Sequence, residues 1–247
     1  MLRAVLQGQS VCAWDCSETD RGKAFLCPLC ESRLGLVLPD PEIRIEHFRH
    51  LDTSPCVSET YQHLEMKYWV ARVLAAANRR VAQPETFVAN RIADVTLGKD
   101  MAVECQVSGL SEAACARRTQ DLNQAGYWVL WLVPLERYLE PIIRSTELER
   151  FLHRVYLGRI YALGMHAQEV ENFVINAVHL QYKRRKHGTP QPSTLRFVRR
   201  RLVQPLRLVG LTTRDVFDPA MPTGLPPEYK LLRFMDPRFW RPWIGRR

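Results

Sequence analysis

The chain has 247 residues, 46% of them hydrophobic, so it can bury a large core as one large domain or as a main domain with appendages. No apolar run approaches the roughly 20 residues needed to span a bilayer, and the first residues lack the apolar stretch of a secretory signal. We therefore expect a cytoplasmic protein without a membrane partner.

The net charge of +9 is concentrated in the C-terminal quarter. From residue 183 onward, Lys and Arg outnumber Asp and Glu by 16 to 4, whereas the preceding residues carry a small acidic excess. This asymmetry favours a polyanionic partner, and nucleic acid is favoured over a membrane because no amphipathic anchor accompanies the charge. The seven cysteines are an odd number and follow no secretory signal, so they indicate metal binding rather than a disulfide framework.

Residues 1–57 are predicted to form a small zinc-finger-like module, because they are rich in Cys, His, Pro and Gly. Four residues have suitable types and spacing to bind a structural Zn²⁺: Cys27, Cys30, His47 and His50. The gap between the two histidines is shorter than in zinc-finger helices, so Cys56 is an alternative to one of them. Two free thiols beside unrelated histidines are the other interpretation. Cys12 and Cys16 lack matching neighbours and are treated as ordinary cysteines.

The predicted core, residues 58–165, begins with a helix for which Ser58 is the expected cap. Strands are predicted in the segments TFVAN, RIADVTL, MAVECQVS and YWVLWLV. A helix capped by Ser111 precedes the last strand, and another helix follows it, with Thr146 and Glu149 at capping-box spacing. This order of elements predicts an α/β fold with a mixed central sheet flanked by helices.

Acidic residues interrupt two neighbouring strands of this core. Side chains alternate along a strand, so Glu104 and Gln106 share one face of MAVECQVS, opposite an apolar face. A three-residue turn at 98–100 would place Asp94 directly across from Glu104, whereas a two-residue turn would place Asp94 on the other face. Facing carboxylates repel unless a cation lies between them, and Mg²⁺ prefers oxygen ligands. An exposed polar face on an edge hairpin is the alternative.

A polar stripe is predicted on the first core helix. Glu59, His63 and Lys67 are spaced by four residues, so on a helix they fall within about 80° of arc. The rest of that helix is apolar, so the stripe is either part of a site or a solvated ladder of charged side chains.

Several arginines are candidates for contact with nucleic acid. Arg117 and Arg118 fall early on the helix after the acidic strands, where a guanidinium can meet a phosphate or face solvent. Arg199, Arg200 and Arg201 belong to the basic extension predicted at 166–247, which suits a phosphate backbone. Tryptophans near the C-terminus could stack on unpaired bases or pack the extension onto the core.

Taken in order, these segments resemble the nuclease core of the CoiA-like competence protein family, a branch of the PD-(D/E)XK restriction-endonuclease-like superfamily. The resemblance rests on the stripe of Glu59, His63 and Lys67, followed by RIADV, VECQVS, ARRT and YWVLWLV, and it covers about residues 25–165. The upstream FLCPLC and HFRH are similar to that family's N-terminal cysteine and histidine module. Each piece is weak alone, but the ordered combination is specific.

The resemblance implies a restriction-endonuclease-like core that acts as a metal-dependent DNA nuclease. It implies that Asp94, Glu104 and the backbone carbonyl of Cys105 hold Mg²⁺ or Mn²⁺, with Glu59 nearby on the helix. The implied role lies in DNA recombination, uptake or processing, with recombination proteins as further partners.

Gln106 departs from the superfamily pattern, because a lysine usually stands at this position. Glutamine can orient a water molecule but cannot take its proton, so Lys67 on the facing helix is a hypothetical source of the missing charge. His63, on the same stripe, is a further catalytic candidate. A non-catalytic DNA-binding accessory protein on the same fold, with a site weakened by Gln106, is the alternative function.

Overall fold

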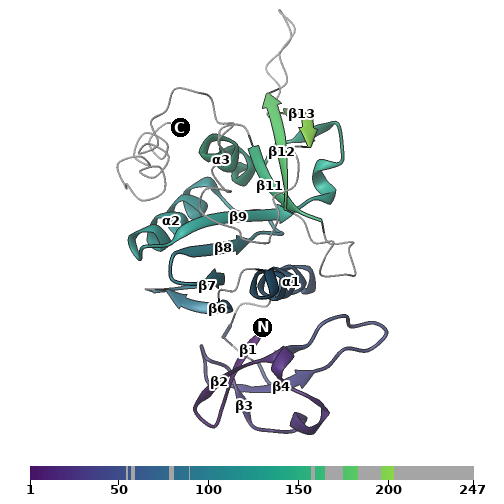
Figure 1. The fold of residues 1–247 in the computed structure, drawn as a ribbon, viewed down its shortest axis with the longest axis vertical. Coiled ribbons are helices and arrows are strands. Elements are labelled where there is room, and N and C mark those ends of the chain that lie inside the picture. The colour runs from purple at the N-terminus through teal and green to yellow at the C-terminus, as the bar shows by residue number, and fades with distance from the viewer. Residues whose placement is uncertain are drawn as a thin grey trace, which may run out of the picture.

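The computed structural model describes residues 1–53, 55–56, 59–77, 81–88, 90–156, 159–164, 175–182 and 196–202. The strands in these ranges form two sheets, one of five strands at the N-terminus and one of eight strands (Figure 1). No helix in the described ranges combines the length and the apolar character needed to cross a membrane.

The five-stranded sheet, which we call the N-terminal module, is antiparallel with the strand order β2-β1-β3-β4-β5. Its strands are β1 (Arg3–Leu6), β2 (Gln9–Cys12), β3 (Phe25–Leu26), β4 (Arg33–Val37) and β5 (His47–His50). Gln7 and Gly8 both take positive φ between β1 and β2, as a tight hairpin turn requires. The module's core cluster consists of Ala4, Ala13, Phe25, Cys27, Leu34 and Phe48. A core this small needs additional stabilisation.

The eight-stranded sheet has the order β10-β13-β12-β11-β9-β8-β7-β6. Its strands are β6 (Ala82–Val88), β7 (Arg91–Leu97), β8 (Met101–Cys105), β9 (Trp128–Pro134), β10 (Ile142–Arg144), β11 (Arg159–Leu163), β12 (Ile175–Tyr182) and β13 (Arg196–Leu202). β9 runs parallel to β8 and β11, and the other pairs are antiparallel. The protein is therefore α/β with a mixed sheet, as the order of predicted elements indicates.

Within the described ranges, three α-helices flank this sheet: α1 (Tyr61–Ala77), α2 (Glu112–Gln124) and α3 (Glu147–Val155). Short 3-10 helices lie at Ala13–Asp15, Glu18–Asp20 and Glu136–Tyr138. The side chain of Ser111 caps α2, and Thr146 and Glu149 form a reciprocal capping box at α3, so both predicted helix starts are confirmed.

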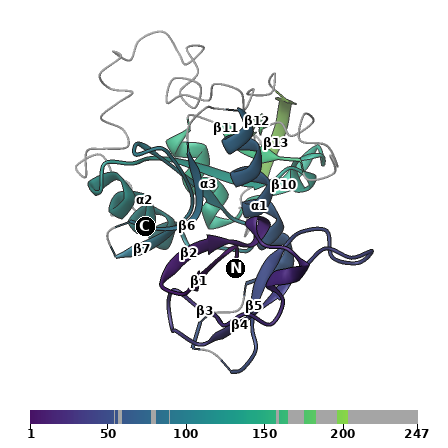
Figure 2. The ribbon, with the colours of Figure 1, turned by 60° about the horizontal axis from the view of Figure 1, so that its bottom comes forward.

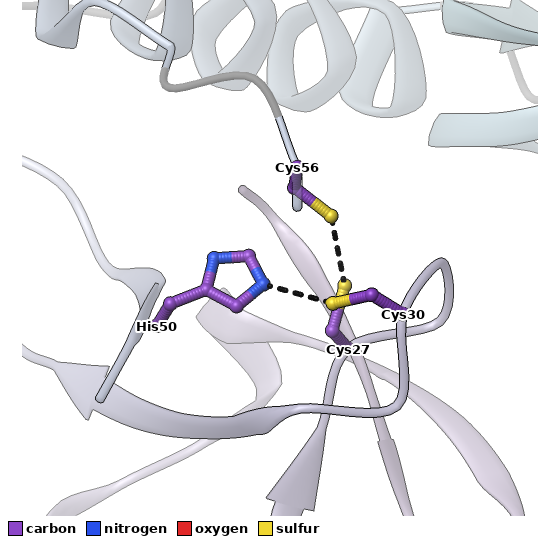
Figure 3. Close-up of side chains that lie close together, drawn as sticks. All are labelled: Cys27, Cys30, His50 and Cys56. Atoms are coloured by element: carbon purple, nitrogen blue, oxygen red, sulfur yellow. Dashed lines mark hydrogen bonds between the residues drawn. The ribbon is translucent and has the colours of Figure 1, made fainter. Parts of the chain in front are cut away.

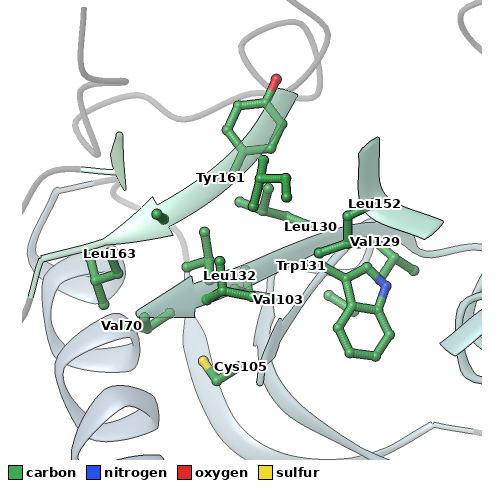
Figure 4. Packing of buried hydrophobic residues seen from close by; sticks show 14 of the residues in the cluster. Val70, Val103, Cys105, Val129, Leu130, Trp131, Leu132, Leu152, Tyr161 and Leu163 are labelled. Carbon is green, nitrogen blue, oxygen red and sulfur yellow. The ribbon is translucent and has the colours of Figure 1, made fainter. Parts of the chain in front are cut away.

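The helices cover opposite faces of the sheet. On β9, Leu132 lies on the side of Val70 from α1, whereas the indole of the neighbouring Trp131 donates to Thr119 of α2 at 2.9 Å (Figure 4). Adjacent residues of a strand point to opposite faces, so β9 is buried on both sides. This is why its sequence is a continuous apolar run and not an alternating one.

The sheet continues past the predicted core boundary at residue 165. β12 pairs with β11, and β13 joins β12 to β10, so part of the predicted basic extension completes the sheet. These strands are held by pairing across the sheet, which local periodicity does not reveal. Arg199, Arg200 and Arg201 fall on β13, but their side chains and the whole of 203–247 lie outside the described residues.

The N-terminal module docks on the core through α1, which lies between the two sheets (Figures 1 and 2). Leu2 and Ile45 of the module form one buried cluster with Leu64 and Tyr68 of α1. Because these side chains bury one another, the module and α1 are packed together by the hydrophobic effect.

Candidate functional site

The two predicted acidic residues come together on neighbouring strands. β7 and β8 pair Leu97 with Met101, so the turn between them has the three residues 98–100. Continuing this register by three residues places Asp94 beside Glu104. The strand pairing therefore confirms the expected register. Asp94 is 5% exposed and Glu104 0%, so the alternative of an exposed edge hairpin is wrong.

Asp94 is held in its charged form by donors from three elements. The amide of Cys105 donates to Asp94 Oδ2 at 2.8 Å, and His63 Nε2 lies 3.4 Å from the same oxygen. A guanidinium nitrogen of Arg118 lies 3.5 Å from Oδ1. Burial alone would raise the pKa of Asp94, but the bond with His63 and the charge of Arg118 outweigh it and hold the pKa below its ordinary value.

Glu104 is less well compensated than Asp94. Arg118 forms an ion pair with Glu104 Oε2, but neither carboxylate oxygen receives a hydrogen bond from the described part of the chain. Burial and the neighbouring charge of Asp94 raise the pKa of Glu104 to about 8. At neutral pH Glu104 is therefore largely protonated in the absence of a further cation, and a bound cation would favour its ionised form.

Arg118 turns toward this acidic pair instead of toward solvent. Its guanidinium also donates to the carbonyl of Ile92 at 3.3 Å and lies 6.0 Å from the centre of the Trp131 ring. Arg117, by contrast, is exposed. The neighbouring arginines therefore differ, with Arg118 compensating buried acids and Arg117 free to meet a partner. Contact of either with nucleic acid stays a prediction.

The polar stripe of α1 reaches Asp94 through His63. Thr60 caps the helix by accepting from the amide of His63 at 3.3 Å, so Glu59 precedes the helix and does not lie in its first turn. The expected cap, Ser58, lies outside the described residues. Glu59 Oε1 nevertheless accepts from His63 Nδ1 at 2.8 Å and from Lys67 Nζ at 2.6 Å. Glu59 therefore contacts both other residues of the stripe, His63 and Lys67.

These contacts determine the charges of the stripe. Burial alone would raise the pKa of Glu59, but His63 and Lys67 lower it to about 2. Burial alone would lower the pKa of His63, but its bonds to Asp94 and Glu59 raise it to about 9. His63 is therefore protonated at neutral pH, so it compensates Asp94 and is not poised to accept a proton.

Glu85 is a buried carboxylate that no sequence motif singles out. It lies on β6 opposite Asp94 in the strand register, with a positive φ of 49°. Its Oε1 accepts from Lys67 Nζ at 2.6 Å, and Lys67 also holds Glu59. Lys67 is thus occupied by these two carboxylates, and the cation in contact with Glu104 is Arg118. The predicted strand TFVAN begins directly after Glu85, whereas the observed β6 starts at Ala82 and therefore includes this acid.

Gln106 follows the end of β8. Its amide donates to the carbonyl of Leu132 at 2.9 Å, which extends the ladder by one step. Its side chain donates to the carbonyl and the hydroxyl of Ser108 at 3.0 and 3.2 Å. The side chain is therefore turned along its own segment. Orientation of a water by Gln106 and metal ligation by the carbonyl of Cys105 stay predictions.

A second group of ligand-type side chains lies in the N-terminal module (Figure 3). Its members are Cys27, Cys30, His50 and Cys56, whose ligand atoms all lie within 4.8 Å of one another. The sulfurs of Cys27 and Cys56 are 3.8 Å apart, and Cys30 Sγ lies 3.5 Å from His50 Nε2. Tetrahedral Zn²⁺ places two sulfur ligands about 3.8 Å apart and sulfur and nitrogen ligands about 3.6 Å apart. The group could hold a metal ion such as zinc.

The fourth member of this group is Cys56 and not His47, which corrects the predicted ligand set in favour of its alternative. His47 and His50 lie three residues apart on β5, so their side chains point to opposite faces of the sheet. His47 Nδ1 lies 3.1 Å from the carbonyl oxygen of Ile45, and its ring packs against Tyr61. Burial lowers the pKa of His47, so it is a neutral packing residue.

The geometry thus defines an α/β protein with two sites, one of buried carboxylates and one of sulfur and nitrogen ligands. Residues 59–196 match the family described as "Competence protein CoiA, nuclease-like domain". The match covers more than half of the chain, so the protein belongs to this family, as the resemblance indicates. No curated protein and no solved structure matched the chain. The matched span contains the acidic pair and Arg118 but not the group around Cys27.

Proposed function

We propose that this protein is a metal-dependent DNA nuclease with a restriction-endonuclease-like core, acting in DNA recombination, uptake or processing. One observation carries the proposal. Asp94 and Glu104 are buried side by side, and the protein compensates their charge only in part, within a domain whose family is described as nuclease-like. A structural role alone would not require two adjacent buried carboxylates.

The residues present fit a hard divalent cation such as Mg²⁺ or Mn²⁺. The donors are carboxylate oxygens, and Glu104 Oε1 is buried without a hydrogen bond from the described residues. Asp94, Glu104 and the carbonyl of Cys105 would hold the ion. When bound, it would lower the pKa of a coordinated water and stabilise the charge that develops on the attacked phosphate.

The surrounding side chains have roles that follow from their charges. His63, protonated at neutral pH, keeps Asp94 ionised and in position. Arg118 is near enough to offer its guanidinium to a phosphate once a cation compensates Glu104 in its place. Gln106 can orient a water but cannot take its proton, so the proton passes to the phosphate, to solvent or to another base.

The remaining parts of the proposal concern DNA and zinc. We propose that exposed basic residues, Arg117 among them, contact the DNA backbone, and that the group of three cysteines and one histidine holds a structural Zn²⁺. Recombination proteins are the proposed partners.

A non-catalytic DNA-binding accessory protein is the second candidate. The position usually held by a lysine is Gln106, and its side chain is bonded to Ser108 and not to Asp94 or Glu104. A site without a proton acceptor at this position favours binding over cleavage.

The two functions are separated by cleavage of labelled single-stranded, duplex and branched DNA in Mg²⁺, Mn²⁺ or EDTA. Wild type would be compared with Glu104→Gln, which keeps the side-chain shape, and with Glu140→Gln, which alters an exposed acid of the same core. We expect metal-dependent cleavage that falls by at least about 100-fold in Glu104→Gln only. Tight binding without cleavage in any metal would establish the accessory function instead.

A further inference from the structure

The N-terminal module reaches the acidic site through Glu85. Glu85 Oε2 accepts hydrogen bonds from the backbone amides of Leu2 and Arg3 at 2.8 and 3.0 Å. These amides belong to the start of the module, and Glu85 belongs to the core strand β6. The guanidinium of Arg3 also donates to the carbonyl of Pro84 at 3.3 Å. One carboxylate thus ties the first strand of the module to the sheet that carries Asp94.

Glu85 makes these contacts from an unfavourable backbone conformation. Its φ of 49° lies in the left-handed region, which is strained for a residue other than glycine. In a regular ladder its side chain would lie next to that of Asp94, a like charge. Here it turns to Lys67 and the module instead, so the strain is tied to a specific set of contacts.

From Glu85 a chain of contacts runs to the acidic pair. Lys67 Nζ lies 2.6 Å from Glu85 Oε1 and 2.6 Å from Glu59 Oε1. Glu59 accepts from His63 Nδ1 at 2.8 Å, and His63 Nε2 lies 3.4 Å from Asp94. Lys67 is 4% exposed and Glu85 9%, so the ion pair between these two residues is little weakened by solvent. A displacement of one of these side chains therefore changes the contacts of the side chain that follows it in the chain of contacts.

The covalent chain provides a second connection between the module and Glu59. Cys56, a member of the metal-type group, precedes Glu59 by only three residues, and Thr60 then caps α1. Figure 3 shows Cys56 on a separate segment from the knuckle of Cys27 and Cys30. Cys56 packs against the module's core cluster, and its sulfur lies 3.8 Å from that of Cys27. A metal that joins the four residues would hold Cys56 more firmly, and with it the position three residues before Glu59.

We propose that the N-terminal module is an integral part of the acidic site, with its bound metal fixing Glu59 through Cys56, and that Glu85 is a positioning residue that ties the module to Lys67. This inference rests on the proposed function in so far as the acidic pair binds a divalent ion. It predicts positive coupling between zinc in the module and Mn²⁺ at the pair, and such coupling is reciprocal.

The test is a titration of the full-length chain with Mn²⁺, followed by electron paramagnetic resonance, in zinc-loaded and zinc-depleted protein. Asp94→Asn identifies the binding that belongs to the acidic pair. We expect Glu85→Gln to weaken this binding at least tenfold while one zinc per chain is retained. Glu65→Gln is the matched control. Glu65 lies on α1 and, like Glu85 on β6, it is a buried acid that contacts the module, in this case through Arg44 at 2.9 Å. Its described ion pair does not involve Lys67.

Zinc depletion of the wild type is expected to weaken Mn²⁺ binding to the same degree, and to remove the difference between wild type and Glu85→Gln. A residue that acts only on stability would not produce this non-additivity in protein that remains folded. A second pair of variants leaves Glu85 in place and covers the case in which Glu85→Gln does not fold. Arg3→Pro removes one amide donor to Glu85 together with the guanidinium contacts of Arg3, whereas Arg3→Ala removes only the guanidinium contacts, so Arg3→Pro is expected to weaken Mn²⁺ binding more than Arg3→Ala does.

The outcomes separate this inference from the proposed function. Asp94-dependent Mn²⁺ binding that is insensitive to zinc, to Glu85→Gln and to Arg3→Pro would overturn the inference and leave the nuclease proposal standing. Coupled binding without DNA cleavage would overturn the nuclease proposal and support the inference. Absence of Asp94-dependent Mn²⁺ binding in zinc-loaded wild type would overturn both.

Discussion

The N-terminal module and the eight-stranded core differ in the size of the apolar cluster that stabilises them. The module has a buried cluster of six residues, and its largest pair, Phe25 and Phe48, pack with ring centres 4.9 Å apart. The core cluster is several times larger, and all the buried charged side chains of the described residues lie in the core or on α1. A large apolar core can offset the cost of buried carboxylates, whereas a small module depends on a metal to hold its chain together.

The two sites follow the same division. The module supplies soft sulfur and imidazole ligands, which suit a structural zinc ion with a closed coordination shell. The core supplies carboxylate oxygens, which suit a hard ion that keeps water ligands and can take part in chemistry. If the proposed metals bind, loss of zinc from the module would disturb folding, whereas loss of the divalent ion from the core would leave the fold intact.

The largest effect is expected from removing a ligand in the module. His50→Gln should abolish stoichiometric zinc binding and expose the amides of β1 to β5 to hydrogen exchange, because zinc-finger-type sites contribute on the order of 10 kcal/mol to folding. His47→Gln should retain zinc, since His47 lies on the other face of β5. Zinc content and hydrogen exchange of both variants measure this. Zinc loss in both His47→Gln and His50→Gln would instead support the ligand set predicted from the sequence, which contains both histidines.

An intermediate effect is expected at Arg118. Removing the partner of a buried carboxylate is destabilising, and because the Arg118 side chain is 26% exposed we expect Arg118→Met to cost about 1–3 kcal/mol in EDTA. Saturating Mn²⁺ should recover most of this loss, because a cation then compensates Glu104. Chemical denaturation with and without Mn²⁺ provides the measurement. Arg117→Met, at the exposed neighbouring position, should change stability by less than about 0.5 kcal/mol.

If Mn²⁺ recovers nothing in Arg118→Met, the acidic pair is a structural ion cluster, and the contrast between a structural site in the module and a chemical site in the core is lost. If Mn²⁺ stabilises the variant more than it stabilises wild type, Arg118 and the metal compete for the same carboxylates.

The smallest effect on stability is expected at Gln106. Its side chain is partly exposed and, among the described residues, bonds to Ser108 two residues away, so Gln106→Ala should change the free energy of unfolding by less than about 0.5 kcal/mol. If cleavage is observed, the same variant tests whether Gln106 orients the attacking water. A stability loss above about 2 kcal/mol would show that Gln106 supports the end of β8 and is not reserved for chemistry.

Local patterns in the sequence determined much of the core. Capping by Ser111 and by Thr146 with Glu149 depends on residues within one turn, so the starts of α2 and α3 are predictable. The register that places Asp94 beside Glu104 follows from a three-residue turn, which also is local. The cysteine knuckle is equally local, and it marks the metal-type group from two residues.

The remaining features were decided by contacts between distant segments. Spacing suggested His47, but the fold brings Cys56 to the group because the two histidines face opposite sides of β5. Lys67 is spaced to face the acidic pair, yet Glu85 holds it from another strand.

The sequence by itself predicted the pairing of Asp94 with Glu104, the cysteine knuckle and the starts of α2 and α3, because side-chain type, turn length and capping act over a few residues. Only the tertiary structure decided which charges meet, because ion pairs between α1, α2 and the sheet depend on how these separate elements pack together. It placed Arg118 against Glu104 and joined the first strand of the chain to Glu85. Those long-range contacts determine how the acidic site is held.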